Sequence, residues 1–322
     1  MVYPVRLGAG DFPSQGNLSQ KRGQAKVHHF AVFSSSERPC LSVEDGLACL
    51  AAAEIKADAA SARWLDADRA WDIPIAEYDA GTLPRLRQQA DESESDINIL
   101  PATGRRKTLL IADMDSTIIT SESLDDMARI AGLAEAIIPI TERAMRGELD
   151  FAAALDERVA LLRGQPESLI ELALAEAELT GGAELVVRTM RAHGASCYLV
   201  SGGFTAITGP VAAMCGFHDH HANLLEAKDG RLTGTVAKPV LDRDSKLAFL
   251  DHYCAALGIA RDDAVCIGDG ANDLAMLQAA GLGVALKGKP LLREAVAVQL
   301  NHTDLTGLLY LQGYGEAEFA GS

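Results

Sequence analysis

Four short apolar segments, separated by long helical stretches, constrain the fold of this chain more than any other feature. They cover residues 108–112, 197–200, 264–267 and 283–286. Short, continuous apolar runs of this kind are typical of strands that are buried on both faces of a parallel sheet. Because helices connect parallel strands, the pattern predicts an α/β domain with a doubly wound parallel sheet over residues 103–322.

A long helical insertion follows the first of these strands. Apolar side chains recur at helical spacing between residues 124 and 177. So many helical residues after a single strand predict a separate cap over the ends of the strands, at about residues 120–180. After the second strand, the pair Asp229-Gly230 predicts a β-hairpin within residues 217–239.

The preceding part of the chain, residues 27–102, predicts a smaller α+β domain. Its expected elements, in the order strand, helix, strand, strand, helix, strand, lie at residues 30–33, 42–55, 62–65, 70–75, 83–89 and 97–100. This is the ferredoxin-like order, which is also used by small-molecule-sensing ACT domains. The order leaves open whether the domain binds a regulator, dimerises or only packs. Residues 1–26 show neither the helical nor the strand periodicity of apolar side chains, and this predicts a flexible leader.

The chain is acidic, with a formal net charge of −16 at pH 7. Such a field repels nucleic-acid backbones, so nucleic acid is not an expected partner. No apolar stretch reaches the roughly 18 to 20 residues of a membrane-spanning helix, and we expect no membrane partner. The six cysteines occur singly, which is typical of buried thiols in a reducing compartment. We therefore expect a cytoplasmic protein, and the sequence leaves a homodimer open.

Polar motifs follow the predicted strands at the point where each strand ends. The residues concerned are Asp113 and Asp115 after the first strand, Ser201 and Gly202 after the second, Asp269, Asn272 and Asp273 after the third, and Lys246 near the start of the preceding helix. Taken singly, each motif also fits an ordinary turn, a helix cap or a solvated lysine. The carboxyl ends of parallel strands meet at one edge of a sheet, so together the motifs predict a phosphate and metal site.

The chemistry of phosphate esters explains this choice of groups. Their hydrolysis is among the slowest uncatalysed reactions, and it is accelerated mainly by positioning and charge neutralisation. Mg²⁺ prefers oxygen ligands and can join carboxylates such as Asp113 and Asp269 to an anionic phosphate. Lys246 would add a positive charge, and the Ser201 hydroxyl and the backbone amides near Gly202 could surround the phosphoryl oxygens.

These four motifs resemble those of the haloacid dehalogenase-like hydrolases, whose core is a Rossmann-like sheet. More narrowly, residues 105–315 resemble the phosphoserine phosphatases (EC 3.1.3.3), some of which carry an ACT-like domain before the core. The resemblance implies hydrolysis of O-phospho-L-serine to L-serine and phosphate, the last step of serine biosynthesis, with Mg²⁺ as cofactor.

The resemblance also implies a role for each motif residue. Asp113 would be the nucleophile, forming an aspartyl-phosphate, and Asp115 would be the general acid and base. Asp113, Asp269 and the backbone carbonyl of Asp115 would bind the metal, and Asp273 would support the metal-bound waters. Asn272 would help to place the phosphoryl group.

Four further residues match the family's substrate pocket. Glu122 and Arg158 match the ligands for the ammonium and the carboxylate of phosphoserine, and an arginine offers a carboxylate a bidentate fork. Met145 and Phe151 match the apolar residues that close over the substrate. From the residues alone, Glu122 and Arg158 could equally be ordinary charges on exposed helix faces. Met145 and Phe151 could equally be apolar residues of a helix face that packs in the core.

Two other functions remain as alternatives. One is a phosphatase or phosphotransferase for another small phosphomonoester, against which Glu122 and Arg158 argue. The other is a phospho-accepting signalling module, since such modules also combine aspartates, a hydroxyl and a lysine around Mg²⁺. A module of that kind must preserve its acyl phosphate, whereas Asp115 would speed its loss.

Two motifs are set aside. Residues 283–289 have the spacing of a phosphate-binding loop, but Pro290 follows and supplies no hydroxyl for Mg²⁺, so we expect no nucleotide site there. His218-Asp219-His220-His221 resembles a metal-binding run, but we expect a solvated turn.

Overall fold

The computed structural model describes residues 28–36, 39–145 and 148–321. The leader expected at residues 1–26 lies outside them. Among the described residues, no helix combines the length and the apolar character needed to cross a membrane. Three sheets organise this part of the chain: a four-stranded sheet, a six-stranded sheet and a two-stranded hairpin.

The six-stranded sheet is parallel throughout and has the strand order β12-β11-β10-β5-β6-β7. Its strands are β5 (Leu109–Ala112), β6 (Ser196–Phe204), β7 (Asp219–Asn223), β10 (Ala264–Gly268), β11 (Leu282–Leu286) and β12 (Val298–Leu300). The four strands expected from the apolar runs are β5, β6, β10 and β11. The structure adds β7 and β12 at the two edges. The parallel sheet that contains all four expected strands confirms the predicted α/β fold class.

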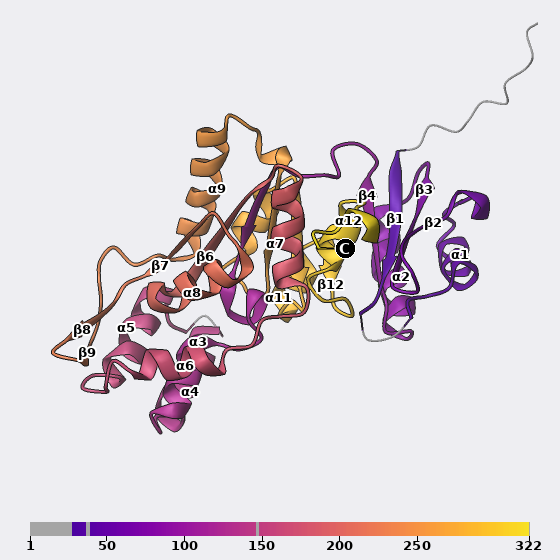
Figure 1. Ribbon diagram of the computed structural model, residues 1–322. Helices are drawn as coiled ribbons and strands as arrows, with labels where there is room; N and C mark the ends of the chain where they lie inside the picture. The colour runs from indigo at the N-terminus through magenta and orange to yellow at the C-terminus, as the bar shows by residue number, and fades with distance from the viewer. Residues whose placement is uncertain (1–27, 37–38, 146–147, 322) are drawn as a thin grey trace, which may run out of the picture.

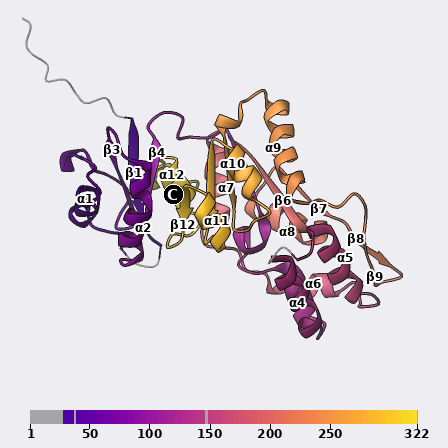
Figure 2. The same ribbon diagram turned by 180° about the vertical axis from the view of Figure 1, so that it is seen from behind.

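Helices cover both faces of this sheet, as the alternation of side chains along β5 illustrates. Leu110 and Ala112 belong to the core beneath α7 (Ala183–Ala192) and α8 (Thr205–Cys215). Leu109 and Ile111 face the opposite core, beneath α9 (Arg243–Leu257), α10 (Leu274–Ala279) and α11 (Pro290–Ala295). Figures 1 and 2 show these two helical layers from opposite sides. Because these strands are buried on both faces of the sheet, they appear in the sequence as continuous apolar segments.

The predicted helical insertion follows β5 and lies beyond one end of the sheet (Figure 1). Its helices are α3 (Ser123–Ile130), α4 (Ala134–Met145), α5 (Phe151–Leu161) and α6 (Leu169–Glu176). The predicted hairpin is formed by β8 (Leu225–Lys228) and β9 (Arg231–Val236), and its turn residues Asp229 and Gly230 both have positive φ. Backbone hydrogen bonds from Gly164 to Leu232 (2.8 Å) and from Leu232 to Gln165 (2.9 Å) attach the hairpin to the chain after α5.

The N-terminal sheet is antiparallel, with the ferredoxin-like order β2-β3-β1-β4. Its elements are β1 (His29–Ser34), α1 (Val43–Ala52), β2 (Arg63–Asp66), β3 (Ala70–Ile75), α2 (Leu83–Asp91) and β4 (Asp96–Pro101). Ser42 caps α1 by accepting the Asp45 N–H, as its sequence position predicts. One face of this sheet packs on α1 and α2 through Phe33, Trp71 and their neighbours.

The other face of the N-terminal sheet packs on the C-terminal helix α12 (Gly307–Leu311), which Figures 1 and 2 place between the two sheets. Arg105 joins the two parts. Its guanidinium pairs with buried Asp72 of β3 at 2.7 Å and donates to the backbone oxygens of Tyr310 and Leu311, each at 3.1 Å. It also lies over the ring of Phe30, 4.6 Å from the centroid. The N-terminal sheet and α12 are thus held together by a buried polar network as well as by apolar contact.

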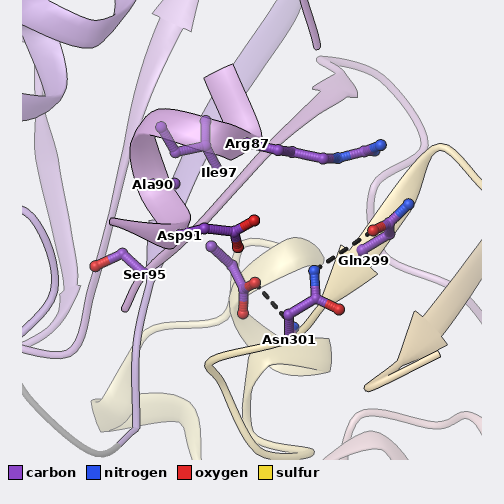
Figure 3. A pocket seen from close by; sticks show the side chains of 8 residues that line it. Arg87, Ala90, Asp91, Ser95, Ile97, Gln299 and Asn301 are labelled. Atoms are coloured by element: carbon purple, nitrogen blue, oxygen red, sulfur yellow. Dashed lines mark hydrogen bonds between the residues drawn. The ribbon is translucent and has the colours of Figure 1, made fainter. Parts of the chain in front are cut away.

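The edge strands β4 and β12 meet at a second polar contact. Asn98 and Gln299 exchange hydrogen bonds of 2.8 and 2.9 Å. The carboxylate of Asp96 accepts backbone N–H groups from Asn301 (2.8 Å), His302 (3.1 Å) and Thr303 (2.9 Å). Figure 3 shows the side chains that line a small, open hollow beside these residues. Its polar groups join the two sheets, and it lies apart from the acidic residues described below.

Two expectations about local structure were wrong. Ser201, Gly202 and Gly203 do not follow the second strand but form its last part, because β6 continues to Phe204 after a register shift against β7. The histidine-rich run is not a solvated turn, since Asp219, His220 and His221 form the first part of the edge strand β7. Its polar side chains find partners there: His220 bonds Thr208 at 2.8 Å, and His221 bonds Tyr253 at 2.6 Å.

Candidate active site

A buried lysine links two of the predicted aspartates. Asp113 follows β5, Asp273 follows β10, and Lys246 lies in the first turn of α9. The Lys246 Nζ is 2.7 Å from Asp113 Oδ1 and 2.6 Å from Asp273 Oδ1, and its side chain is only 1% exposed. Burial alone would lower the pKa of Lys246, but the two carboxylates raise it above its usual value. The lysine is therefore a fixed positive charge at this edge of the sheet.

Asp113, Asp269 and Asp273 form an acidic cluster. One carboxylate oxygen from each lies within 4.8 Å of those of the other two, and all three residues are buried. Burial raises the pKa of Asp269 to about 6, and burial together with Asp113 raises the pKa of Asp273 to about 7. Burial makes Asp269 and Asp273 harder to ionise, and a hard divalent cation beside them would favour their ionised forms. The donor set thus fits a metal ion.

Asp115 lies beside this cluster. Its Oδ1 accepts the backbone N–H of Ser123 at 2.8 Å, and its Oδ2 accepts the hydroxyl of Ser201 at 3.2 Å. Burial, followed by the charge of Glu122, raises the pKa of Asp115 to about 7. A carboxyl with this pKa exists in both protonation states near neutral pH, which suits a group that must first give and then accept a proton.

The end of β6 brings glycines into close contact with the site. The Gly203 N–H donates to Ser201 Oγ at 2.9 Å, and a Cβ on Gly203 would lie 2.9 Å from Asp115 Oδ2. A Cβ on Gly202 would lie 2.7 Å from Cζ of Phe151, the first residue of α5. The glycines therefore allow a close approach of the backbone to Asp115 and to the helical insertion.

The loop after β10 is equally tight. A Cβ on Gly268 would lie 2.3 Å from the Asp273 Cγ, and one on Gly270 would lie 2.4 Å from the Asn272 Oδ1. The backbone N–H of Gly270 also donates to Asp273 Oδ2 at 3.2 Å. Asn272 thus lies on the same loop as Asp269 and Asp273, next to the acidic cluster.

The charged residues expected to select the substrate come from the helical insertion. Glu122 precedes α3, and its Oε1 accepts the Ser116 hydroxyl at 3.0 Å. Arg158 of α5 donates through Nη1 to Thr141 Oγ1 at 3.2 Å. Burial lowers the pKa of Arg158, while the charges of Asp125, Glu122 and Asp115 oppose that shift. Glu122 and Arg158 are thus both close enough to Asp115 to interact with it electrostatically.

Of the two apolar residues expected over the substrate, Phe151 lies against Gly202 as described above. Met145 is the last residue of α4, and its side chain lies outside the described part of the structure.

Lys289 reaches the site from the segment that sequence reasoning set aside. Its Nζ is 3.1 Å from Asp269 Oδ2 and 3.4 Å from Glu122 Oε1. The signal that could have found it is its place just beyond the carboxyl end of β11, the fourth predicted strand, since each of the other motifs lies at that same edge. The likeness of residues 283–289 to a nucleotide-binding loop, which Pro290 interrupts, concealed this position.

Comparison with known proteins agrees with this arrangement. Residues 110–278 match the family of haloacid dehalogenase-like hydrolases. A phosphoserine phosphatase of Streptomyces coelicolor is 44% identical over 214 residues, which are 66% of this chain and 52% of that protein. The matched region spans about half the length of this relative and of a Mycobacterium tuberculosis phosphoserine phosphatase.

Two solved structures have a similar fold. A haloacid dehalogenase family hydrolase of Salmonella enterica has a TM-score of 0.78 and 28% identity, with 88% of this chain and 97% of that chain covered. A phosphoserine phosphatase described as a phospho-aspartyl intermediate analogue has a TM-score of 0.60 and 37% identity, with 63% and 98% covered. This chain therefore belongs to the haloacid dehalogenase-like hydrolases and, within them, to the phosphoserine phosphatases.

Proposed function

We propose that this protein hydrolyses O-phospho-L-serine to L-serine and phosphate with Mg²⁺ as its cofactor, as the last step of serine biosynthesis. The observation that carries the proposal is the association of two sets of charges around Asp115. The acidic cluster with Lys246 provides the means to transfer a phosphoryl group, and Glu122 with Arg158 provides an anion and a forked cation for an amino acid. Its relatives include proteins named phosphoserine phosphatase.

The metal would be held by the carboxylates of Asp113 and Asp269 and by the backbone carbonyl of Asp115. Asp273, which is fixed by Lys246 at 2.6 Å, would support waters bound to the ion. When bound, a divalent cation lowers the repulsion between these carboxylates and the phosphate. Lys246 contributes a second positive charge next to the attacking group.

Asp113 is the proposed nucleophile. Its Oδ1 already accepts the Met114 N–H at 2.8 Å and the ammonium of Lys246 at 2.7 Å, and these contacts orient the carboxylate. One carboxylate oxygen attacks phosphorus, the bond between phosphorus and the serine oxygen breaks, and an aspartyl-phosphate forms. The protonated Asp115 donates its proton to the departing serine oxygen.

The second step reverses the role of Asp115. Its carboxylate now takes a proton from a water whose oxygen attacks phosphorus, and phosphate leaves while Asp113 is regenerated. The Ser201 hydroxyl, the backbone at Gly202, the amide of Asn272 and Lys246 would hold the phosphoryl oxygens through both steps. The backbone N–H of Ser123, which donates to Asp115 Oδ1 at 2.8 Å, would keep the Asp115 carboxyl directed to the reacting atoms while the Ser201 hydroxyl turns from Asp115 to the phosphoryl group.

Substrate selection would come from the helical insertion. Glu122 would bind the ammonium of phosphoserine, Arg158 would bind the carboxylate, and Met145 and Phe151 would close over the substrate. The contact of Phe151 with Gly202 supports this closure, because it joins the insertion directly to the strand that carries Ser201.

We also propose the division into a domain over residues 27–102 and a phosphatase domain over 103–322 with a cap at about 120–180. The separate N-terminal sheet and the helices inserted after β5 support these limits.

Phosphate release from phosphoserine, phosphothreonine and several sugar phosphates, with Mg²⁺ and with a chelator, tests the proposed function. We expect a preference for phosphoserine that requires Mg²⁺ and that is lost in Arg158→Ala. The matched control is Arg129→Ala, which removes an exposed arginine of the insertion that pairs with Glu176. Equal turnover of all compounds by the unmodified protein would contradict the assignment of Glu122 and Arg158.

A further inference from the structure

The carboxylate that would receive the substrate's ammonium already has a cationic partner. Lys289 Nζ lies 3.4 Å from Glu122 Oε1, and the same ammonium lies 3.1 Å from Asp269 Oδ2. Lys289 thus bridges the residue proposed to select the substrate and a residue proposed to hold the metal. An incoming ammonium group would meet a carboxylate that is already paired.

The contacts of Lys289 indicate a side chain that can exchange partners. Its backbone N–H donates to the Asp269 carbonyl oxygen at 2.9 Å, so its main chain is fixed next to the acidic cluster. Its side chain is 40% exposed and that of Glu122 is 38% exposed, whereas Lys246 is 1% exposed. A half-exposed ion pair is weak and is separated at little cost, unlike the buried pair of Lys246 and Asp113.

We propose that Lys289 is a specificity-determining residue that competes with the substrate's ammonium for Glu122. A phosphomonoester without an amino group leaves the pair of Lys289 and Glu122 intact. Phosphoserine must break that pair to form an ion pair between its own ammonium and Glu122. The binding free energy it gains is therefore only the difference between the two ion pairs. Lys289 therefore reduces the preference for amino-bearing ligands that Glu122 alone would give. The inference rests on the proposed function, because it takes Glu122 as the ammonium ligand.

The charges around Lys289 favour this role over direct binding of the phosphate. The ammonium of Lys289 contacts two carboxylates, and one of them, Glu122, belongs to the helical insertion rather than to the motifs around phosphorus. If Lys289 bound only the phosphate, its removal would lower the affinity for amino-bearing and amino-free ligands by the same factor. Competition for Glu122 predicts that the two kinds of ligand respond differently.

The test compares two phosphonates that cannot be hydrolysed, 2-amino-3-phosphonopropionate and 3-phosphonopropionate, by calorimetric titration of the full chain with saturating Mg²⁺. The measured quantity is the ratio of the Kd of the amino-free ligand to the Kd of the amino ligand. We expect Lys289→Met to raise this ratio about fivefold, the upper end of what a half-exposed ion pair contributes. Lys289→Arg, which keeps the charge, should retain the original ratio.

Two controls separate this effect from a general change of charge. Lys287→Met removes an exposed lysine two residues away and should leave the ratio unchanged. Glu122→Gln and the double variant with Lys289→Met complete a thermodynamic cycle, in which Lys289→Met should no longer alter the ratio once Glu122 is neutral. Thermal unfolding of each variant checks that it is folded.

An unchanged or lower ratio in Lys289→Met would overturn the inference, as would an equal rise in Lys287→Met. If the unmodified protein releases phosphate from phosphoserine, such a result leaves the proposed function standing. Failure to hydrolyse phosphoserine would instead contradict the proposed function, and the inference with it.

Discussion

The ring of Phe151, at the start of α5, packs directly on the backbone of Gly202 in β6. A Cβ on Gly202 would lie only 2.7 Å from the Phe151 Cζ. This contact joins the helical insertion to the strand whose Ser201 hydroxyl donates to Asp115. The contact between the insertion and β6 therefore depends on the absence of a side chain at position 202.

Gly202→Ala should therefore disturb the closure over the substrate. An added methyl group in a packed contact costs about 1 to 3 kcal/mol, so we expect kcat/KM for phosphoserine to fall by about tenfold or more. Steady-state kinetics would measure the effect, with Gly81→Ala as the control, since a Cβ at Gly81 meets nothing closer than 3.4 Å. The double variant Gly202→Ala, Phe151→Leu should lose less kcat/KM, expressed as a free energy, than the sum of the losses in the two single variants. Strictly additive losses would argue against the contact.

The pKa of Asp115, raised to about 7 by burial and by Glu122, predicts opposite pH dependences for the two chemical steps. Formation of the phosphorylated protein needs the protonated carboxyl, so its rate should fall as the pH rises through about 7. Hydrolysis of that species needs the carboxylate, so its rate should fall as the pH decreases through the same range. Rapid-quench measurements can separate the two rates, and Asp115→Asn should remove both dependences. A common direction for both steps would contradict the assignment.

The ion pair of Arg105 with Asp72 predicts that the N-terminal sheet contributes to the stability of the whole chain. Asp72→Asn leaves the guanidinium of Arg105, whose side chain is 8% exposed, without its carboxylate. Removing one partner of a buried pair typically costs roughly 3 to 5 kcal/mol in the free energy of unfolding. Glu318→Gln, which breaks the exposed pair with Arg106, should cost less than about 1 kcal/mol. Urea unfolding would measure both, and equal effects would contradict a structural role for the contact.

Much of the fold could be predicted because the buried strands and the amphipathic helices leave clear patterns in the sequence. The edge strand β7 could not, since its half-buried histidines find hydrogen-bond partners in other elements, such as Tyr253. The three residues of β12 are too few to show any period. The packing of α12 between the two sheets depends on contacts between distant segments, which no local pattern records.

The candidate site was predictable to a similar extent. Asp113, Lys246, Asp269 and Asp273 were expected at one edge of the sheet, and the structure brings them together there. The contact of Phe151 with Gly202 was not, because no motif pairs a residue of the insertion with a particular strand. The bridge from Lys289 to Glu122 was not, because residues 283–289 were compared only with a nucleotide-binding loop. Lys289 shows that the rule about strand ends is a better guide than the match to a phosphate-binding pattern.

The central claim is that Asp113 becomes covalently phosphorylated during turnover. The most direct test is mass spectrometry of the protein quenched in acid within milliseconds of mixing with phosphoserine and Mg²⁺. We predict a phosphorylated peptide with the modification on Asp113, and no such peptide in Asp113→Asn. A phosphoryl group on another side chain, or rapid turnover by Asp113→Asn, would contradict the account.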